Sequence, residues 1–321
     1  MGYRQVTGHT PSKVAKGRSA DRPAREGIAM SRTADMTQEQ RKRQYELEQQ
    51  ARREILASSP AERSEVTQKA YDRLYSNAPW HSSLRATPES RAARVKRQAT
   101  LLTQHVARAK RVLEVGCGRG DLLTYLAQRF PGVEFTGIDI SEVKIDHVER
   151  AKTPNLTFLA GDCVEPPAPQ HTYDLIISSQ VLEHFHPDDT PKHLHAVCQL
   201  LAPGGTYEMD TPHRYTGPHD VSKFFTREAS GTHLKEWTFA ELSQALRAAG
   251  FTRIETDVPF VAHLRRILPV PGDAVLMPVG VKVALEQVLR YIPGWRLRRA
   301  VFRMARMDNM LLYASTAKTH A

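Results

Sequence analysis

Short apolar segments alternate with helical stretches between residues 111 and 210, and this alternation constrains the fold more than any other feature of the chain. The apolar segments, each suited to a short strand, are 111–115, 133–139, 156–162, 173–179 and 205–210. The helix-forming stretches between them are 121–130, 142–152 and 190–202. Strands and helices that alternate at this length build a parallel sheet covered by helices, so we predict an α/β fold.

The sequence that follows predicts further elements at one edge of this sheet. A helix at 238–249 ends at Gly250, a residue suited to a helix C-terminus, and strands are expected at 251–258 and 309–316. Residues 259–308, which separate these two strands, are expected to be an insertion with apolar and basic helices.

The sequence that precedes the alternation predicts a helical extension. Strong helix formers fill 37–57, a second helix is expected from Ser59 onward, and a third over 88–109. The first residues of the chain are polar and show no periodicity, which is typical of a disordered segment. The predicted organisation is a disordered basic tail at 1–35, a helical extension at 36–104 and a domain at 105–321.

The positive charge of the chain lies outside its middle part. The net charge of +10 is made up of +11 in residues 1–110, −8 in 111–260 and +7 in 261–321. Basic flanks of this kind can contact nucleic acid or an anionic membrane, although solvated basic surfaces are common. The N-terminus has no apolar signal core and the three Cys have no paired spacing, so we expect a cytoplasmic protein with reduced thiols.

A glycine-rich segment, "VLEVGCGRGDLL" (112–123), points to a nucleoside ligand. Gly116, Gly118 and Gly120 follow a buried strand and precede a helix, a place where glycines let a ligand approach the backbone. The next strand ends at Asp139, 19 residues after Gly120 (139 − 120). An acidic residue at this distance can accept hydrogen bonds from both hydroxyls of a ribose.

The carboxylates beside this loop argue against a dinucleotide. A nicotinamide dinucleotide favours Gly-x-Gly-x-x-Gly, whereas this loop reads Gly-x-Gly-x-Gly, with Glu114 before it and Asp121 after it. Negative charges at these positions would repel a pyrophosphate and suit a ligand that carries an ammonium and a sulfonium. The chain also lacks the Tyr-x-x-x-Lys pair of short-chain dehydrogenases.

Several motifs in a fixed order resemble the class I S-adenosylmethionine-dependent methyltransferases. They are "LEVGCGRG", "GIDIS", "GDC", "YDLIISSQVLEHF", "LLAPGGTYEMDTP" and "HLKEWTFAELSQALRAAGF", and they lie within about 105–258. Within this class the chain resembles the small-molecule members of the ubiquinone-type O-methyltransferases. The resemblance implies a Rossmann-like sheet of seven strands, the last antiparallel and supplied by 309–316, within a methyltransferase domain at 105–321.

The resemblance also implies which residues hold the donor, S-adenosylmethionine. Glu114, Gly116 and Gly118, within the loop that ends at Gly120, would hold its methionine end, with Ser179 lining the same part. Asp139 would bind the ribose and Ile140 would face the adenine. Asp162 would bind the adenine amino group, with the backbone of Cys163 close by. The donor-binding residues expected are therefore Glu114, Gly116, Gly118, Gly120, Asp139, Ile140, Asp162, Cys163 and Ser179.

The stretch "QVLEHFHPDD" (180–189) follows the fourth predicted strand, where the acceptor is expected. The ubiquinone-type enzymes carry Glu-x-x-Glu-His here and can hold a divalent cation, but Gln180 replaces the first Glu in this chain. A metal bound by Glu183 and His184, with Asp188 or Asp189, is therefore disfavoured, and we predict no metal ligand. His184 remains a candidate general base, although Glu183 and His184 could instead bond neighbouring loops.

A second polar segment, "TPHRYTGPHDVSKFF" (211–225), follows the fifth strand. It carries His213 and His219, two further candidates for the catalytic base. A polar loop at this edge of the sheet often contacts the acceptor. The alternative is an ordered loop whose histidines bond the backbone, and the sequence leaves both interpretations open.

Other parts of the chain are candidates for contact with the acceptor. The aromatic stretch 71–83 and apolar residues of the insertion could roof a pocket for a small organic molecule. The basic helix at 294–306 could contact a membrane or a lipid-linked or anionic substrate, or could simply face solvent.

We therefore expect in-line methyl transfer from S-adenosylmethionine to a small-molecule acceptor, with a hydroxyl oxygen as the preferred target. Methylation of protein or nucleic acid is the alternative within the same enzyme class. It is disfavoured because "SSQVLEH" stands where base-amine methyltransferases carry Asn/Asp-Pro-Pro-Tyr/Phe. A regulatory module that binds the donor without catalysis is the remaining alternative. The sequence does not define an oligomeric state.

Overall fold

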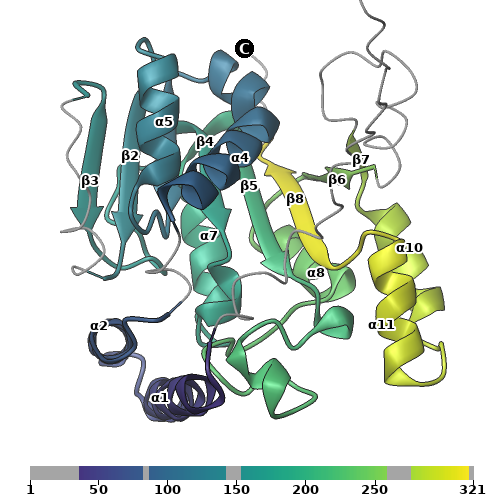
Figure 1. Cartoon of the computed structure of the whole chain (residues 1–321). Coiled ribbons are helices and arrows are strands. Elements are labelled where there is room, and N and C mark those ends of the chain that lie inside the picture. The colour runs from purple at the N-terminus through teal and green to yellow at the C-terminus, as the bar shows by residue number, and fades with distance from the viewer. Residues whose placement is uncertain (1–35, 82–86, 142–152, 259–275, 318–321) are drawn as a thin grey trace, which may run out of the picture. The chain divides into compact units, whose positions relative to one another are not determined.

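The computed structural model describes residues 36–81, 87–141, 153–258 and 276–317 (Figure 1). The chain separates into two units, Met1–Asp35 and Met36–Ala321, and all described residues belong to the second unit. The predicted tail at 1–35, the helix predicted at 142–152 and the first part of the predicted insertion lie outside the described residues.

The centre of the fold is a sheet of eight strands in the order β3-β2-β1-β4-β5-β8-β6-β7. The strands are β1 (Arg111–Val115), β2 (Glu134–Asp139), β3 (Leu156–Ala160), β4 (Tyr173–Ser179), β5 (Leu201–Pro212), β6 (Arg253–Asp257), β7 (Leu276–Pro278) and β8 (Asn309–Ser315). The pairs among β1 to β5 are parallel, whereas β8 runs antiparallel to both β5 and β6.

The predicted Rossmann-like α/β fold with an antiparallel last strand is confirmed. The number of strands differs, because the sheet has eight strands where seven were predicted. The additional strand is β7, a three-residue segment from the predicted insertion that pairs with the outer edge of β6. Such a short strand has no sequence periodicity of its own and forms only because β6 offers a free edge.

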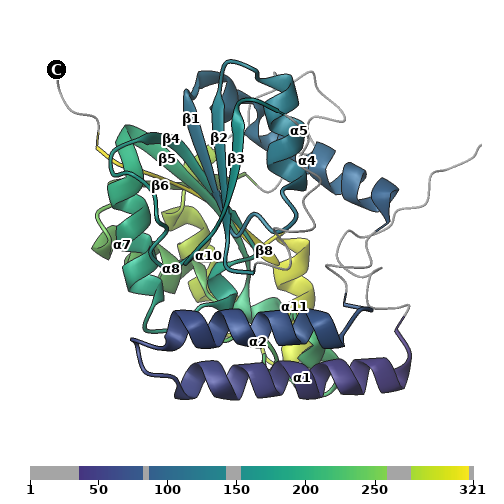
Figure 2. The ribbon, with the colours of Figure 1, turned by 90° about the vertical axis from the view of Figure 1, so that its left-hand side faces the viewer.

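Helices cover both faces of the sheet, as the edge-on view shows (Figure 2). On one face, α4 (Pro88–Arg108) and α5 (Asp121–Arg129) pack leucines and valines against β1 and β2. On the other face lie α7 (Thr190–Leu200), α8 (Phe239–Ala248) and α10 (Gly280–Leu289). The sheet is therefore covered on both sides, which explains why successive residues of β1 and β4 are buried instead of every second one.

Two N-terminal helices lie across the carboxyl ends of the parallel strands (Figures 1 and 2). They are α1 (Gln38–Ala57), which begins with a capping box of Thr37 and Gln40, and α2 (Arg63–Asn77). The two helices share an apolar cluster that includes Leu47, Ile55 and Leu74. Because open parallel sheets bind ligands at the carboxyl ends of their strands, α2 is placed to roof a binding site.

Three short 3-10 helices and one further α-helix complete the described fold. They are η1 (Leu182–His184), η2 (Arg214–Thr216), η3 (Val221–Phe224) and α11 (Trp295–Met304). Within the described ranges, no helix combines the length and apolar character needed to cross a bilayer.

Candidate functional site

The glycine loop between β1 and α5 has a backbone that only glycine adopts readily. Gly116, Gly118 and Gly120 have φ angles of +73°, +57° and +67°. The amides of Gly116 and Cys117 both donate to the Ile138 carbonyl, at 2.7 and 3.0 Å, which ties the loop to the end of β2.

The surroundings of the first two glycines differ. A Cβ on Gly116 would lie 2.4 Å from a methyl of Val181, whereas a Cβ on Gly118 would meet no atom within 4 Å. The loop is therefore packed closely at Gly116 and borders open space at Gly118. An open space against backbone amides is what a ligand that approaches the chain requires.

Asp139 ends β2 with a carboxylate that is only 3% exposed. One of its oxygens accepts from the Gly118 amide at 2.8 Å and the other from the Ser141 amide at 3.0 Å. Each carboxylate oxygen can accept two hydrogen bonds, so both retain capacity for a donor such as a ribose hydroxyl.

A pocket opens between this sheet edge and α2. Its lining comes from α2, from the ends of β2 and β3 and from the segment after β4: Pro60, Arg63, Ser64, Thr67, Tyr71, Tyr75, Gly116, Asp139, Ile140, Ser141, Asp162, Cys163, Val164, Glu165, Gln180, Val181, His184, Phe185, His186, Asp189 and Lys192. The predicted donor residues in this lining are Gly116, Asp139, Ile140, Asp162 and Cys163. One pocket thus joins the predicted donor residues of three strand ends to His184.

Glu114 lies on β1 just before the loop, is buried and is not among the residues that line the pocket. Burial, with the neighbouring charge of Asp139, raises the pKa of its carboxyl to about 8, although Arg94 acts in the opposite direction. Among the described residues, its Oε2 atom finds no hydrogen-bond partner. A buried carboxylate oxygen without a partner is costly unless a cation or a hydrogen-bond donor completes it.

Ser179 ends β4 outside the pocket lining. Its hydroxyl donates to Asp210 and accepts from the Gln98 side chain at 2.9 Å. Asp210 also accepts from Gln180 at 2.8 Å and from Asn309 at 2.9 Å. The structure therefore places Ser179 in a polar cluster at the ends of β4, β5 and β8.

The roof of the pocket depends on two polar contacts of α2. Arg63 and Asp189 form a buried ion pair, with 2.6 Å between Nη1 and Oδ1. Asp72, toward the other end of α2, accepts from the Ser141 hydroxyl at 2.7 Å. Sequence reasoning missed this ion pair, because Arg63 and Asp189 are 126 residues apart and Asp189 was considered only as a metal ligand.

His184 lines the pocket at the end of η1 and is held by two neighbours. Its Nδ1 lies 2.9 Å from the Tyr71 hydroxyl and 3.0 Å from the Thr232 carbonyl oxygen. Because a carbonyl oxygen can only accept, we assign the proton to Nδ1, which leaves the lone pair of the neutral ring on Nε2. An imidazole held in this tautomer can take a proton at Nε2.

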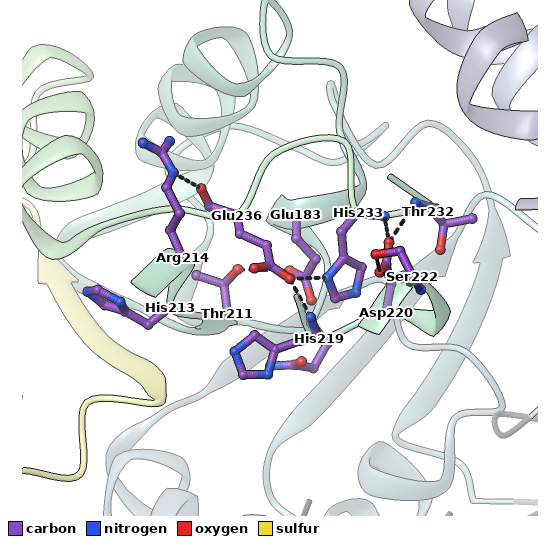
Figure 3. A network of polar contacts seen from close by, with 12 residues as sticks. Glu183, Thr211, His213, Arg214, His219, Asp220, Ser222, Thr232, His233 and Glu236 are labelled. Atoms are coloured by element: carbon purple, nitrogen blue, oxygen red, sulfur yellow. Dashed lines mark hydrogen bonds and ion pairs between the residues drawn. The ribbon is translucent and has the colours of Figure 1, made fainter. Parts of the chain in front are cut away.

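The His184 ring contacts the ring of His233, which belongs to a network of acidic groups and histidines (Figure 3). Burial would lower the pKa of His233, but its hydrogen bond to Glu236 and the charges of Glu183 and Asp220 raise that pKa to about 9. Burial raises the pKa of Glu183 to about 7, and its Oε2 accepts from Thr211 at 2.9 Å. His233 is thus a buried imidazolium at neutral pH.

The charge on His233 bears on metal binding. Glu183, His184 and His233 each offer a ligand atom, and these atoms lie within 4.8 Å of one another. A metal ligand must be a neutral imidazole, so the raised pKa of His233 disfavours an ion there. Of the acidic residues considered from the sequence, Asp189 pairs with Arg63 and the Asp188 side chain is 80% exposed.

His213 and His219, the other candidate bases, lie outside the pocket lining. His213 is fully buried, accepts from the Tyr215 amide at 3.1 Å and lies 2.8 Å from a Glu286 oxygen. His219 lies 2.9 Å from the Thr216 hydroxyl, and burial lowers its pKa to about 4. In this structure both rings bond their own loop and its neighbours, and of the three candidates His184 alone faces the pocket.

Comparison with known proteins gives consistent matches. A family model described as "Methyltransferase domain" matches residues 84–256. A probable S-adenosylmethionine-dependent methyltransferase of Mycolicibacterium smegmatis is 32% identical over 150 residues, which are 46% of this chain and 54% of that protein. The chain thus spans about half of that relative.

A second relative is covered more fully. The phthiotriol/phenolphthiotriol dimycocerosates methyltransferase of Mycobacterium leprae is 30% identical over 232 residues, which are 71% of this chain and 81% of that protein. Among solved structures, a SAM-dependent methyltransferase from Archaeoglobus fulgidus matches with a TM-score of 0.46 and 19% identity, over 71% of this chain and 95% of that one.

Proposed function

We propose, from the premise that this chain belongs to the class I S-adenosylmethionine-dependent methyltransferases, that it methylates a hydroxyl oxygen of a small lipid-like acceptor. Two relatives support the acceptor class. The Mycobacterium leprae protein is named for phthiotriol and phenolphthiotriol dimycocerosates. A protein of Mycolicibacterium smegmatis, 34% identical over 111 residues (34% of this chain, 40% of that one), is named fatty-acid O-methyltransferase.

The residues at the sheet edge fit the donor. In this proposal Glu114 receives the ammonium of the methionine end, which would complete its unpaired Oε2. Asp139 uses its remaining acceptor capacity for the ribose, between the loop at Gly118 and the apolar side chain of Ile140. Asp162 and the backbone of Cys163 then face the adenine. When bound, the donor supplies a methyl group already activated by a sulfonium.

Since the donor is activated, the protein has to align the acceptor, exclude water and remove a proton. Helix α2 excludes water, because Arg63, Tyr71 and Tyr75 close the pocket over the strand ends. His184 accepts the hydroxyl proton at Nε2. The Thr232 carbonyl and Tyr71 hold its ring in the tautomer that can do so.

The orientation of His184 is the observation that carries the assignment of a base. Its test begins with a screen for transfer of a labelled methyl group to lipid and metabolite extracts, with protein and nucleic acid as separate samples. Label in the lipid or metabolite fraction supports the proposal. Label only in protein or nucleic acid contradicts it, and donor binding without transfer to any sample points to a non-catalytic module.

The acceptor found in this way allows His184 to be tested against a matched control. We expect His184→Ala to lower kcat by about 100-fold or more, because a positioned base contributes about that much, with the affinity for S-adenosylhomocysteine unchanged. His195→Ala, on the exposed face of α7, should keep full activity. Full activity of His184→Ala would exclude it as the base, and loss of activity on chelation would reinstate a metal.

A further inference from the structure

Helix α10 buries its two charged residues and exposes three of its aliphatic residues, while Val283 and Leu289 pack against the core. Lys282 and Glu286, one turn apart, are 0% and 2% exposed. The Lys282 ammonium lies 2.6 Å from an Asp257 oxygen of β6. Glu286 accepts from the Phe239 amide at 2.6 Å and lies 2.8 Å from His213. The inner face of α10 is therefore fixed to the core by its charged residues.

The outer face of α10 is correspondingly apolar. Val281, Leu285 and Val288 follow the i, i+4, i+7 spacing that puts side chains on one side of a helix, and they are 54%, 36% and 70% exposed. The segment that leads into and through α11 continues this character. Its exposed apolar side chains are Tyr291, Trp295, Leu297 and Met304, at 73%, 39%, 55% and 75%. Exposed apolar residues gathered in this way mark an interaction site more often than a solvated surface.

Helices α10 and α11 form a hairpin, residues 280–306, and the second half of this hairpin carries only positive charges. No acidic residue occurs from 287 to 307, and six arginines do: Arg290, Arg296, Arg298, Arg299, Arg303 and Arg306. None of the six forms an ion pair with a carboxylate in the described part of the chain. Arg290 and Arg296 instead lie over the rings of Tyr291 and Trp295, at 4.7 and 5.6 Å from the ring centroids.

We propose that the hairpin of α10 and α11 docks onto an anionic phospholipid bilayer. Aliphatic side chains such as Val288 and Met304 would enter the boundary between head groups and acyl chains. Tyr291 and Trp295 suit the head-group level, and the arginines would meet lipid phosphates. A nucleic acid would account for the arginines but would leave the aliphatic face uncovered. None of the hairpin residues lines the pocket under α2, so this surface is distinct from the proposed donor site.

Vesicle flotation with the full chain tests the proposal. We expect binding to vesicles of equal phosphatidylglycerol and phosphatidylcholine, much weaker binding to phosphatidylcholine alone, and release as salt is raised. Equal binding to both kinds of vesicle, or no binding to either, would overturn it. If the full chain binds a nucleic acid probe through this hairpin but binds no vesicle, the partner is a nucleic acid. That result would also overturn the proposal.

Two variants separate insertion from charge, each with a control on α4. Val288→Asp with Tyr291→Asp should abolish vesicle binding, whereas Leu101→Asp, which also places an acidic residue at an exposed apolar position (43%), should not. Arg296→Gln with Arg303→Gln should lower the partition coefficient about thirtyfold at low salt, since each basic residue near the surface contributes about 1 kcal/mol.

Lys96→Gln with Arg97→Gln, on the exposed face of α4, removes the same net charge and should have much less effect. All variants should keep their affinity for S-adenosylhomocysteine, which shows that they remain folded. If the α4 controls weaken binding as much as the hairpin variants do, the attraction is a property of net charge and the assignment to this hairpin fails.

Discussion

Binding of the donor's ammonium should release a proton from Glu114. Burial and Asp139 raise the pKa of this carboxyl to about 8, so the ligand-free site holds a proton at neutral pH. An ammonium favours the ionised carboxylate, and binding must therefore expel that proton. At pH 7 a group with this pKa is about 90% protonated, so we expect release of about 0.9 proton for each ligand bound.

The same linkage fixes how affinity depends on pH. Below pH 8 the affinity for S-adenosylhomocysteine should rise as Glu114 loses its proton, by about twentyfold from pH 6 to pH 7.5. Isothermal titration in two buffers of different ionisation enthalpy measures the released protons directly. In Glu114→Gln the release should vanish, the pH dependence should flatten, and affinity should fall about tenfold to a hundredfold, because a hydrogen bond to a charged group is lost.

A buried acidic residue outside the site provides the control. Glu208 is also buried with a raised pKa, but it lies on β5 beside His105, and β4 separates β5 from β1 and its glycine loop. Glu208→Gln should therefore leave proton release unchanged. Equal proton release in wild type and Glu114→Gln would show that the ammonium does not reach Glu114, and the assignment of the methionine end would have to be abandoned.

Three further perturbations test the site and its roof. Arg63→Ala should lower the free energy of unfolding in urea by about 3–5 kcal/mol, because it strands a buried carboxylate, whereas Lys69→Ala, which breaks an exposed pair, should change it by less than about 1 kcal/mol. Gly118→Ala should weaken binding of S-adenosylhomocysteine in calorimetry, since its Cβ would enter the open space beside the loop, and Gly132→Ala should not; equal affinities would contradict the loop assignment. The pKa of His233 is raised from 6.5 to about 9, so its contribution to the free energy of unfolding is complete below pH 6.5. About 3 kcal/mol of this free energy should be lost as the pH rises through 9. If wild type and His233→Gln show the same dependence of unfolding on pH, this reasoning is refuted.

The conformation of the glycine loop and the place of Asp139 at the end of β2 could be predicted from sequence, because local constraints determine them. A left-handed turn after a buried strand requires glycine, and Gly116 and Gly118 have positive φ angles in the structure. Asp139 follows from the length of one helix and one strand, which is nearly constant in a parallel sheet. The number of residues between the glycine loop and Asp139 was therefore enough to predict that both lie at the same edge of the sheet. The pocket at this edge also includes Ile140 and Asp162.

The acceptor half could not be predicted in the same way, because it depends on long-range packing. The sequence offers His184, His213 and His219 as candidate bases, and tertiary contacts separate them. His213 contacts Glu286, which is 73 residues away in the sequence, and His184 contacts Tyr71, which is 113 residues away. No local pattern encodes such pairs. His233 and Glu236 lie only three residues apart, but this spacing by itself does not indicate a buried network.

Two helices outside the parallel part of the fold, α2 and α10, are each attached to it by an ion pair. In each pair at least one side chain is fully or nearly buried. Arg63 of α2 contacts Asp189 at 2.6 Å, and Lys282 of α10 contacts Asp257 at 2.6 Å. Buried pairs of this kind contribute little net stability compared with apolar residues of the same size, but removing one member is costly. Their main effect is therefore to favour one placement of each helix. For α2 that placement closes the pocket over Asp139, and for α10 it turns Val281 and Val288 outward. A buried ion pair thus holds α2 over the proposed reaction site. A second ion pair holds α10 so that its exposed face forms part of the surface that we propose meets the membrane.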